Sequence, residues 1–271
     1  MRESEFAALL EVDDHHWWYR GRRRVLAAAL ERLPVRADAA ILDAGCGSGR
    51  TMDELRRLGR VTGFDLNPLG VEAARTRGHA DVRTAAVEQI PHGDDSFELI
   101  TCLDVLEHTP DDVLSLQELY RVARPGALLV ATVPAYQALW SDHDEANHHY
   151  RRYRRASLRR AAAHAGWEPV AFTYFNSILL PAAAALRVTQ RVARRRRVAQ
   201  PRSQLHMTPP RVNWLLEVPL RIEAALIGLG VRLPAGLSLL AVLRKPAASA
   251  DQRAPAPTSE RRQRDPAASP L

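Results

Sequence analysis

Short apolar runs alternate along the chain with longer segments in which apolar residues recur every three or four positions. A run of about four to eight residues that ends at Gly, Asp or Pro predicts a buried strand, and an apolar stripe at helical spacing predicts an amphipathic helix. The predicted strands of the first half lie at residues 39–43, 61–64, 80–87, 97–102 and 127–133. Because helical patterns separate them, we expect a parallel sheet with helices on both of its faces.

The same patterns divide the chain into successive segments. A helical cap precedes an α/β core, and a basic, apolar helical insertion separates the core from one last strand. The final residues are rich in Pro, Ala, Ser and Arg without periodicity, which predicts a disordered tail. The boundaries that we expect are residues 1–37, 38–175, 176–235, 236–245 and 246–271.

The 271 residues are 46% hydrophobic and 25% charged, which is ordinary for a globular protein with a sizeable core. The first residues, MRESE, lack the apolar centre of a signal peptide, and no segment is apolar over the roughly 18 residues that a transmembrane helix needs. The two cysteines, Cys46 and Cys102, form no CxxC pair, and we interpret them as small packing residues. These features predict a cytoplasmic protein.

The net charge of +7 conceals an uneven distribution. Residues 1–150 contain 16 Arg and 25 Asp and Glu, whereas residues 151–271 contain 22 Lys and Arg and 6 Asp and Glu. One interpretation is a coding bias toward Arg on solvated faces, with residues 176–235 forming a lid over the sheet. The other is a basic, apolar flank that meets an anionic membrane surface at the inner face of the membrane. No nucleic-acid module accompanies the charge, so nucleic acid is not an expected partner.

A glycine-rich turn follows the first predicted strand, with the spacing Gly45-x-Gly47-x-Gly49. Such a turn lets a ligand approach the backbone at the start of a helix. The second predicted strand ends at Asp65, whose carboxylate is placed to accept hydrogen bonds from both hydroxyls of a ribose. A dinucleotide fingerprint would place Gly at position 50, which is Arg here, so the spacing disfavours a nicotinamide-dependent oxidoreductase.

Five segments follow one another in a recognisable order and spacing. They are ILDAGCGSG at residues 41–49, VTGFD at 61–65, EQIP and DSFELI within 88–100, DVLEH at 104–108 and residues 119–132. Together they resemble the motifs of class I S-adenosylmethionine-dependent methyltransferases, in particular the methyltransferase type 11 and ubiquinone-pathway O-methyltransferase-like subgroup. The resemblance covers roughly residues 38–175 and implies a Rossmann-like, mostly parallel seven-stranded sheet and S-adenosylmethionine as the cofactor.

The resemblance also implies roles for individual cofactor-binding residues. The glycines of the turn would lie under the methionine part of the cofactor, with Asp43 facing its amino end. Asp65 would bind the ribose, and Leu66 would lie against the adenine. An Asp that usually binds the adenine amino group is replaced by Ala86, which leaves the backbone of Val87 for that contact. The complete predicted set is Asp43, Gly45, Cys46, Gly47, Asp65, Leu66, Val87 and Leu103.

Methyl transfer requires alignment of the nucleophile, exclusion of water and, for a hydroxyl acceptor, removal of a proton. Ligands of open α/β sheets lie at the carboxyl ends of the strands, so the candidate residues follow the fourth and fifth strands. A histidine is a suitable base near neutral pH. We predict catalytic roles for His149, His143, His108 and Asp104, substrate contacts for Trp140, Arg151, Arg152 and Tyr153, and no metal. A structural alternative is that these residues only order a long loop.

The loop at residues 139–153 resembles that of a bacterial methyltransferase subgroup associated with envelope glycans and lipids. The expected function is therefore methyl transfer to an oxygen of a small-molecule, lipid-linked or glycan-linked acceptor. The alternatives are a non-catalytic S-adenosylmethionine-binding module and, less favoured, a nicotinamide-dependent oxidoreductase. Ahead of the first helix, Trp17 and Trp18 predict either a lid over the cofactor or packing against the sheet edge.

Overall fold

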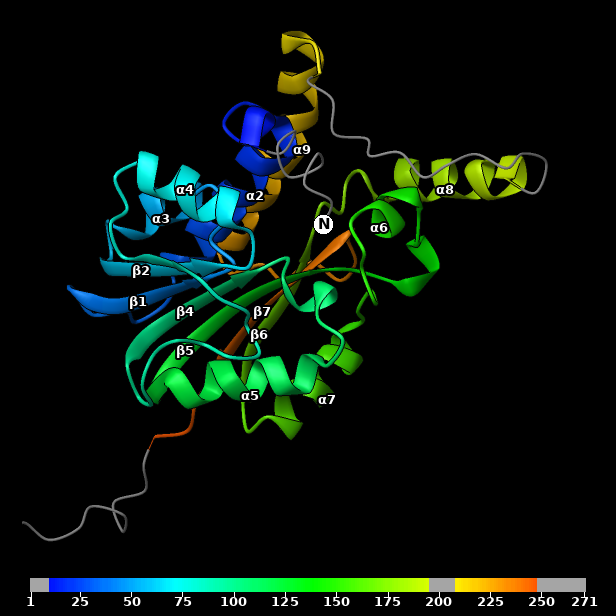
Figure 1. Ribbon diagram of the computed structural model, residues 1–271. Coiled ribbons are helices and arrows are strands. Elements are labelled where there is room, and N and C mark those ends of the chain that lie inside the picture. Colours follow the sequence, from blue (N-terminus) through cyan, green and yellow to red (C-terminus); the bar gives the residue numbers. More distant parts are fainter. Residues whose placement is uncertain (1–9, 195–207, 248–271) are drawn as a thin grey trace, which may run out of the picture.

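One seven-stranded sheet forms the centre of the molecule, in the order β3-β2-β1-β4-β5-β7-β6 (Figure 1). The computed structural model describes residues 10–194 and 208–247, so the predicted tail at 246–271 lies almost entirely outside the described residues. Neighbouring strands from β3 to β5 are parallel, whereas β7 runs antiparallel to both β5 and β6. This sheet confirms the predicted fold class, a mostly parallel Rossmann-like sheet with a helical insertion before the last strand.

Each predicted strand of the core is present, with shifts of a few residues at its ends. The strands are β1 (Ala39–Ala44), β2 (Gly59–Asp65), β3 (Val82–Thr84), β4 (Phe97–Leu103), β5 (Ala123–Pro134), β6 (Glu168–Phe175) and β7 (Ser238–Arg244). The α-helices are α2 (Trp17–Leu30), α3 (Arg50–Leu55), α4 (Pro68–Thr76), α5 (Asp112–Val122), α6 (Asp142–Ala146), α7 (Arg155–His164), α8 (Leu180–Arg194) and α9 (Pro210–Gly228). Short 3₁₀ turns lie at η1 (Leu106–His108) and η2 (Gln137–Leu139).

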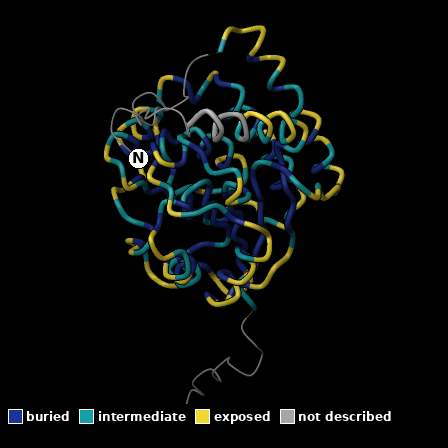
Figure 2. Tube along the Cα trace, turned by 90° about the vertical axis from the view of Figure 1, so that its right-hand side faces the viewer, coloured by how far each residue is buried: buried dark blue, intermediate teal, exposed yellow. Residues whose placement is uncertain are grey.

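Helices cover both faces of the sheet, and the strands are accordingly apolar on both sides. In β1, Ile41 packs in the cluster formed with α2 and α9, and Leu42 packs in the cluster formed with α5 and α7. Leu99 and Ile100 of β4 alternate in the same way, and all four side chains are fully buried. Continuous apolar runs therefore encode central strands that are buried on both faces. Figure 2 shows these buried strands surrounded by exposed outer turns of helix.

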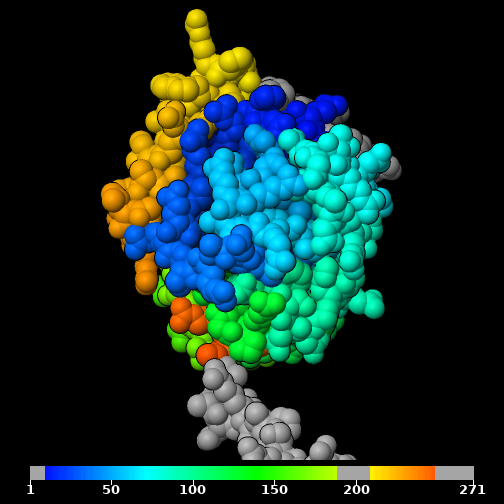
Figure 3. Space-filling model, turned by 90° about the vertical axis from the view of Figure 1, so that its left-hand side faces the viewer, coloured from blue at the N-terminus to red at the C-terminus, as the bar shows by residue number. Residues whose placement is uncertain are grey.

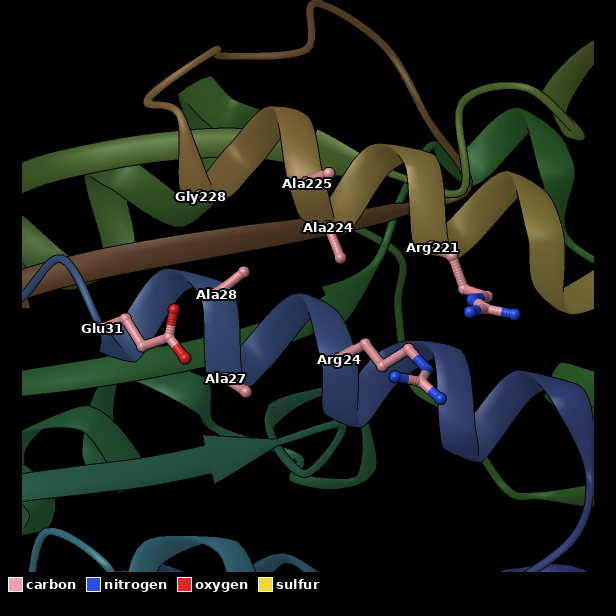
Figure 4. A pocket seen from close by; sticks show the side chains of 8 residues that line it. All are labelled: Arg24, Ala27, Ala28, Glu31, Arg221, Ala224, Ala225 and Gly228. Carbon is pink, nitrogen blue, oxygen red and sulfur yellow. The ribbon is translucent and has the colours of Figure 1, made fainter.

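The helices α2 and α9 lie side by side although about 190 residues separate them, as the hydrogen bond between Arg24 and Glu217 shows. Small residues permit the close approach: a Cβ atom on Gly21 would lie 2.3 Å from Cδ1 of Leu220. A shallow groove of about 340 Å³ runs between the two helices, with an alanine-rich floor (Figure 4). The insertion thus contributes α9 to the packing of the N-terminal cap.

Candidate active site

A large cavity of about 1270 Å³ lies at the carboxyl ends of β1, β2 and β4. Its walls also include residues of α2, of the loop around α6, and of α8 and α9. Cavities for one drug-sized ligand are typically about 300–1,000 Å³, so this one has room for a cofactor together with an acceptor. The position agrees with the rule that open α/β sheets bind ligands beyond the carboxyl ends of their strands.

The glycine-rich turn after β1 adopts a backbone conformation that other residues rarely adopt. Gly45, Gly47 and Gly49 have φ angles of +77°, +52° and +77°. A Cβ atom on Gly45 would lie 2.3 Å from Cγ2 of Val105, whereas one on Gly47 would meet no atom within 4 Å. Because Gly47 lines the cavity, its missing side chain leaves the backbone open to a ligand.

Asp65 connects this turn to the end of β2. Its Oδ2 atom accepts a hydrogen bond of 2.8 Å from the backbone N–H of Gly47, and Oδ1 accepts one of 2.8 Å from the N–H of Asn67. Burial raises the pKa of the Asp65 carboxyl, and the two backbone N–H donors oppose that rise. The carboxylate that the resemblance assigns to the ribose therefore also fixes the shape of the glycine turn.

Asp43, at the end of β1, has one satisfied and one unsatisfied oxygen. Its Oδ1 atom accepts a hydrogen bond of 2.6 Å from the hydroxyl of Thr101, whereas the buried Oδ2 atom has no partner. Burial raises the pKa of Asp43 to about 6, although the Thr101 hydrogen bond opposes the rise. An unpaired buried oxygen beside an open glycine turn fits a ligand that brings an ammonium group. All eight predicted cofactor-binding residues line this cavity: Asp43, Gly45, Cys46, Gly47, Asp65, Leu66, Val87 and Leu103.

The N-terminal segment closes one side of the cavity. Asp13 is 5% exposed and accepts a hydrogen bond from the hydroxyl of Ser48 in the glycine turn. It also accepts one of 3.0 Å from Nη1 of Arg23. Trp17 and Trp18 line the cavity, and Trp18 also stacks on Phe175 with 5.9 Å between ring centroids. Trp18 therefore packs against the edge strand β6, as one of the two predicted roles requires, and the lid over the cofactor stays a prediction.

His149 lies at the centre of a polar cluster contributed by the loop after β5. Its Nδ1 atom is 2.9 Å from Oδ1 of Asp144, which is 0% exposed. Arg152 donates to both oxygens of the same carboxylate, from Nε at 2.7 Å and from Nη2 at 2.9 Å. Burial would raise the pKa of Asp144, but the hydrogen bonds from His149 and Arg152 outweigh it and hold that pKa well below its usual value. Asp144 therefore stays negatively charged, and its carboxylate orients the imidazole of His149.

His108 and His143 flank His149 and present their rings to it edge to face. The ring centroids of His108 and His149 are 4.6 Å apart, and those of His143 and His149 are 6.0 Å apart. Burial, and then the neighbouring His149, lower the pKa of His108 to about 3 and that of His143 to about 4. Both rings are consequently neutral at physiological pH.

Glu107 completes this cluster from the turn η1. Its side chain is buried and its Oε2 atom has no partner, while burial and the charge of Asp104 raise its pKa well above the usual value. Ligand atoms of Glu107, His108 and His149 lie within 4.8 Å of one another, so these side chains form a group that could hold a metal ion. The prediction of no metal at this site stays a prediction.

Asp104, predicted as catalytic, lines the cavity but is engaged in an ion pair. Its Oδ2 atom lies 2.5 Å from Nη1 of Arg22, and Oδ1 accepts a hydrogen bond of 3.1 Å from the hydroxyl of Thr132. The sequence analysis does not identify Arg22, because it is one of three consecutive arginines in the first helix and nothing in the pattern distinguishes it. The ion pair connects the N-terminal cap to the end of β4.

Three of the four residues predicted to contact the substrate lie outside the cavity lining. Tyr153 is 2% exposed and donates a hydrogen bond of 2.8 Å to Asp112, with which Arg151 also forms an ion pair at 3.1 Å. Trp140 lies outside the lining as well, at the end of η2. Arg152 does line the cavity, but both edges of its guanidinium bind Asp144, so it orders the histidine loop rather than clamping an anion. The contacts of Arg151, Arg152 and Tyr153 agree with the alternative that these residues order the loop, and their contact with a substrate stays a prediction.

The helical insertion supplies cavity residues that sequence patterns did not single out. Leu179, Ala182 and Leu186 come from α8 and its approach, and Leu216 comes from α9. They add apolar side chains to the cavity wall, in which Arg187 of α8 also takes part. Their apolar spacing predicted a helix, but which side of that helix would face the site depends on tertiary packing.

Comparison with known proteins finds a match to a known family over the central region. Residues 42–131 match the family model of the methyltransferase domain. The ubiquinone biosynthesis O-methyltransferase of Xanthomonas oryzae pv. oryzae is 34% identical over 141 residues, which are 46% of this chain and 57% of the relative. The match thus spans little more than half the length of that relative, and it leaves the acceptor of this chain open.

Solved structures share the fold over most of the chain. A Haloferax volcanii methyltransferase, solved in complex with the Trm112 methyltransferase activator, has a TM-score of 0.60 and 22% sequence identity, with 91% of this chain and 96% of that chain covered. The [4+2]-cyclase SpnF has a TM-score of 0.54 and 18% identity, with 84% of this chain and 81% of that chain covered. At such identities the likeness establishes the fold alone.

Proposed function

We propose that this chain transfers a methyl group from S-adenosylmethionine to an oxygen of a lipid-linked or glycan-linked small molecule, since residues 42–131 match the family model of the methyltransferase domain. The observation that carries the proposal is the pairing of His149 with the buried Asp144 beside a cavity that holds all the predicted cofactor residues. A hydroxyl acceptor requires such an oriented histidine, because the proton of the hydroxyl must be removed as the methyl group is transferred.

The residues at the strand ends would each bind a different part of the cofactor. The unpaired oxygen of Asp43 would accept the cofactor's ammonium group, the open backbone at Gly47 would lie along the methionine part, and Asp65 would bind the ribose. Leu66, 72% exposed at the cavity wall, would cover the adenine. When bound, the cofactor supplies a methyl group that is already activated by its positively charged sulfur.

The histidine cluster would prepare the acceptor. Because Nδ1 of His149 bonds Asp144, Nε2 is the ring nitrogen left to receive the acceptor's proton. Asp144 would stabilise the imidazolium that forms, and its bond with Arg152 would prevent the aspartate from taking the proton itself. His108 and His143, held neutral by their lowered pKa values, would orient the acceptor hydroxyl without adding positive charge.

An amphipathic acceptor suits the two unlike walls of the cavity. The histidine loop offers polar groups, whereas Leu179, Ala182 and Leu216 form an apolar wall. A reactive hydroxyl at His149 and an apolar chain along α8 and α9 would satisfy both. We place this chemistry in the cytoplasm at the inner face of a membrane, where such an acceptor would be available. None of the described helices has the length and hydropathy needed to cross a bilayer.

Labelled cofactor tests the proposal directly. The purified chain is incubated with S-adenosylmethionine carrying a labelled methyl group and with lipid and glycan extracts, and the product is identified by mass spectrometry. The expected result is label on an oxygen of a lipid-linked or glycan-linked compound. Label only in soluble small molecules, or on nitrogen, would refute the acceptor class.

Two alternatives require separate measurements. A non-catalytic binding module would bind S-adenosylmethionine by calorimetry but give no labelled product with any extract. A nicotinamide-dependent oxidoreductase would bind NAD more tightly than S-adenosylhomocysteine. The enzyme that we propose binds S-adenosylhomocysteine more tightly and releases it during turnover.

A further inference from the structure

Helix α9 buries Leu220, Ala224 and Ile227 together with three polar residues, and it also exposes large apolar side chains, which an ordinary surface helix does not do. Its inward positions include Asn213, Glu217 and Glu223, which are 9%, 2% and 1% exposed. Each has specific partners: Asn213 accepts from the N–H of Trp17 at 2.7 Å, and Glu217 pairs with Arg24 at 2.9 Å and Arg20 at 3.2 Å. Glu223 accepts from two backbone N–H groups at the approach to α8, at 2.7 and 2.9 Å. The buried face is therefore fixed by the protein itself.

The opposite face of α9 carries large apolar side chains in contact with solvent. Leu215 is 61% exposed, Ile222 is 49% exposed and Leu229, directly after the helix, is 78% exposed. Their spacing of seven residues places them on one side of the helix, and Trp214 beside them is 60% exposed. We call this set, Trp214, Leu215, Ile222 and Leu229, the outer stripe. Figures 1 and 3 show the first turns of α9 projecting beyond the body of the molecule.

The exposed charged residues of α9 and of the segment directly after it are all arginines, and Glu31 of the N-terminal cap lines the same groove as Arg221. Residues 176–235 contain ten Arg and only two acidic residues, and those two are the buried Glu217 and Glu223. Arg211, Arg221 and Arg232 are exposed beside the stripe, and no acid of the described chain forms an ion pair with them. Figure 4 shows Arg221 at the edge of the groove between α9 and α2. An apolar stripe whose own segment exposes three arginines and no acid is complementary to a surface that is both apolar and negatively charged.

From this arrangement we propose that the outer stripe of α9 inserts into the surface of an anionic lipid bilayer, with Arg211, Arg221 and Arg232 at the lipid headgroups. A second copy of the chain fits less well, because a symmetric contact would bring together two faces that both expose arginines. A nucleic acid would satisfy the arginines but would leave the leucines and the tryptophan in water.

The membrane-facing helix is also a wall of the active site. Leu216, next to the outer stripe, lines the cavity together with Leu179 and Ala182. A bilayer at α9 would therefore lie beside the apolar wall, so that an acceptor's apolar chain could remain near the lipid while its hydroxyl reaches His149. This last step depends on the proposed function, whereas bilayer binding by the outer stripe does not.

Vesicle flotation with the full chain tests the proposal. Vesicles of phosphatidylcholine alone are compared with vesicles that also contain phosphatidylglycerol, at low and at high salt. We expect binding to the anionic vesicles. Leu215→Glu should weaken that binding at least about tenfold, because the leucine that the bilayer would bury is lost. Arg221→Gln should weaken binding about fivefold, and only to the anionic vesicles. Leu114→Glu, a matched change at a leucine that is 44% exposed on α5, should leave binding unchanged.

Three results would overturn the proposal. The first is a correctly folded wild-type chain, judged by circular dichroism, that does not float with anionic vesicles. The second is equal flotation of the Leu215→Glu variant and the wild type. The third is a stable dimer in light scattering that Leu215→Glu dissociates, which would assign the stripe to a second copy.

Failure here and failure of the proposed function are distinguishable. Leu215 lies outside the cavity lining, so Leu215→Glu should bind S-adenosylhomocysteine as the wild type does. Loss of flotation with intact cofactor binding supports the bilayer surface, and flotation without any methyl transfer would refute only the enzyme.

Discussion

Nδ1 of His149 lies 2.9 Å from Oδ1 of Asp144, and the two residues are only five positions apart in a loop between β5 and α7. The aspartate is completely buried, yet its charge is kept by Arg152. A carboxylate in this position selects the tautomer that leaves Nε2 as an acceptor. The short helix α6 and its capping box, in which Ser141 bonds Asp144, position the aspartate for this contact.

Replacement of His149 by Gln should lower kcat by about 10²- to 10⁴-fold, because a positioned general base contributes about that much. The affinity for S-adenosylhomocysteine should stay within about twofold, since none of the proposed cofactor contacts involves this ring. The checks are steady-state kinetics and calorimetry. His143→Gln is the matched control from the same loop, and an equal or larger loss of kcat in that variant would assign the base to His143 instead.

Asp43 should make cofactor affinity depend on pH. Its pKa of about 6 in the free protein means that the carboxylate is protonated below that pH and cannot pair with the cofactor's ammonium group. Affinity for S-adenosylhomocysteine should therefore be constant above pH 7 and fall about tenfold per pH unit below 6. Calorimetry from pH 5 to pH 8 measures this slope. In Asp43→Asn the affinity should be lower and nearly independent of pH, and a slope unchanged by the substitution would contradict the assignment.

Gly21 should be required for the contact between α2 and α9. Alanine is the better helix former by about 1 kcal/mol, but its Cβ atom would overlap Leu220 at 2.3 Å. Overpacking costs about 1–3 kcal/mol, so Gly21→Ala should lower the free energy of unfolding despite the gain in propensity. Urea denaturation checks this, with Gly93→Ala, which has no neighbour within 3.9 Å, as the control. The double variant with Leu220→Ala should show favourable coupling, and simple additivity of the two losses would count against the overlap.

Treatment with a chelator distinguishes between two roles of His149, general base and metal ligand. If Nε2 accepts the proton, a chelator should leave turnover unchanged, and added Zn²⁺ should inhibit because it would occupy the cluster of Glu107, His108 and His149. Initial rates with a chelator and across a Zn²⁺ titration provide the measurement. Inactivation by the chelator with recovery on adding a divalent cation would show that the cluster is a metal site.

The first half of the fold was predictable because its signals are local. The apolar runs place β1, β2 and β4 to within a few residues, and the turn at Gly45 and Gly47 marks where a ligand meets the backbone. The histidine loop was predictable only as a group of polar residues. Its sequence does not distinguish Arg152, which binds a buried carboxylate, from a residue that binds substrate.

The sequence by itself determined the alternating α/β architecture and the cofactor-binding end of the sheet, because strand periodicity and glycine geometry depend on neighbours within a few residues. Only the tertiary structure decided which face of α9 is buried and which histidine pairs with Asp144. The first choice depends on contacts across long distances in the sequence, such as that of Asn213 with Trp17. The second depends on the high cost of burying the charge of Asp144 without a partner. Apolar spacing predicts that a helix such as α9 forms, but the partners of the helix's polar residues decide which of its faces is buried.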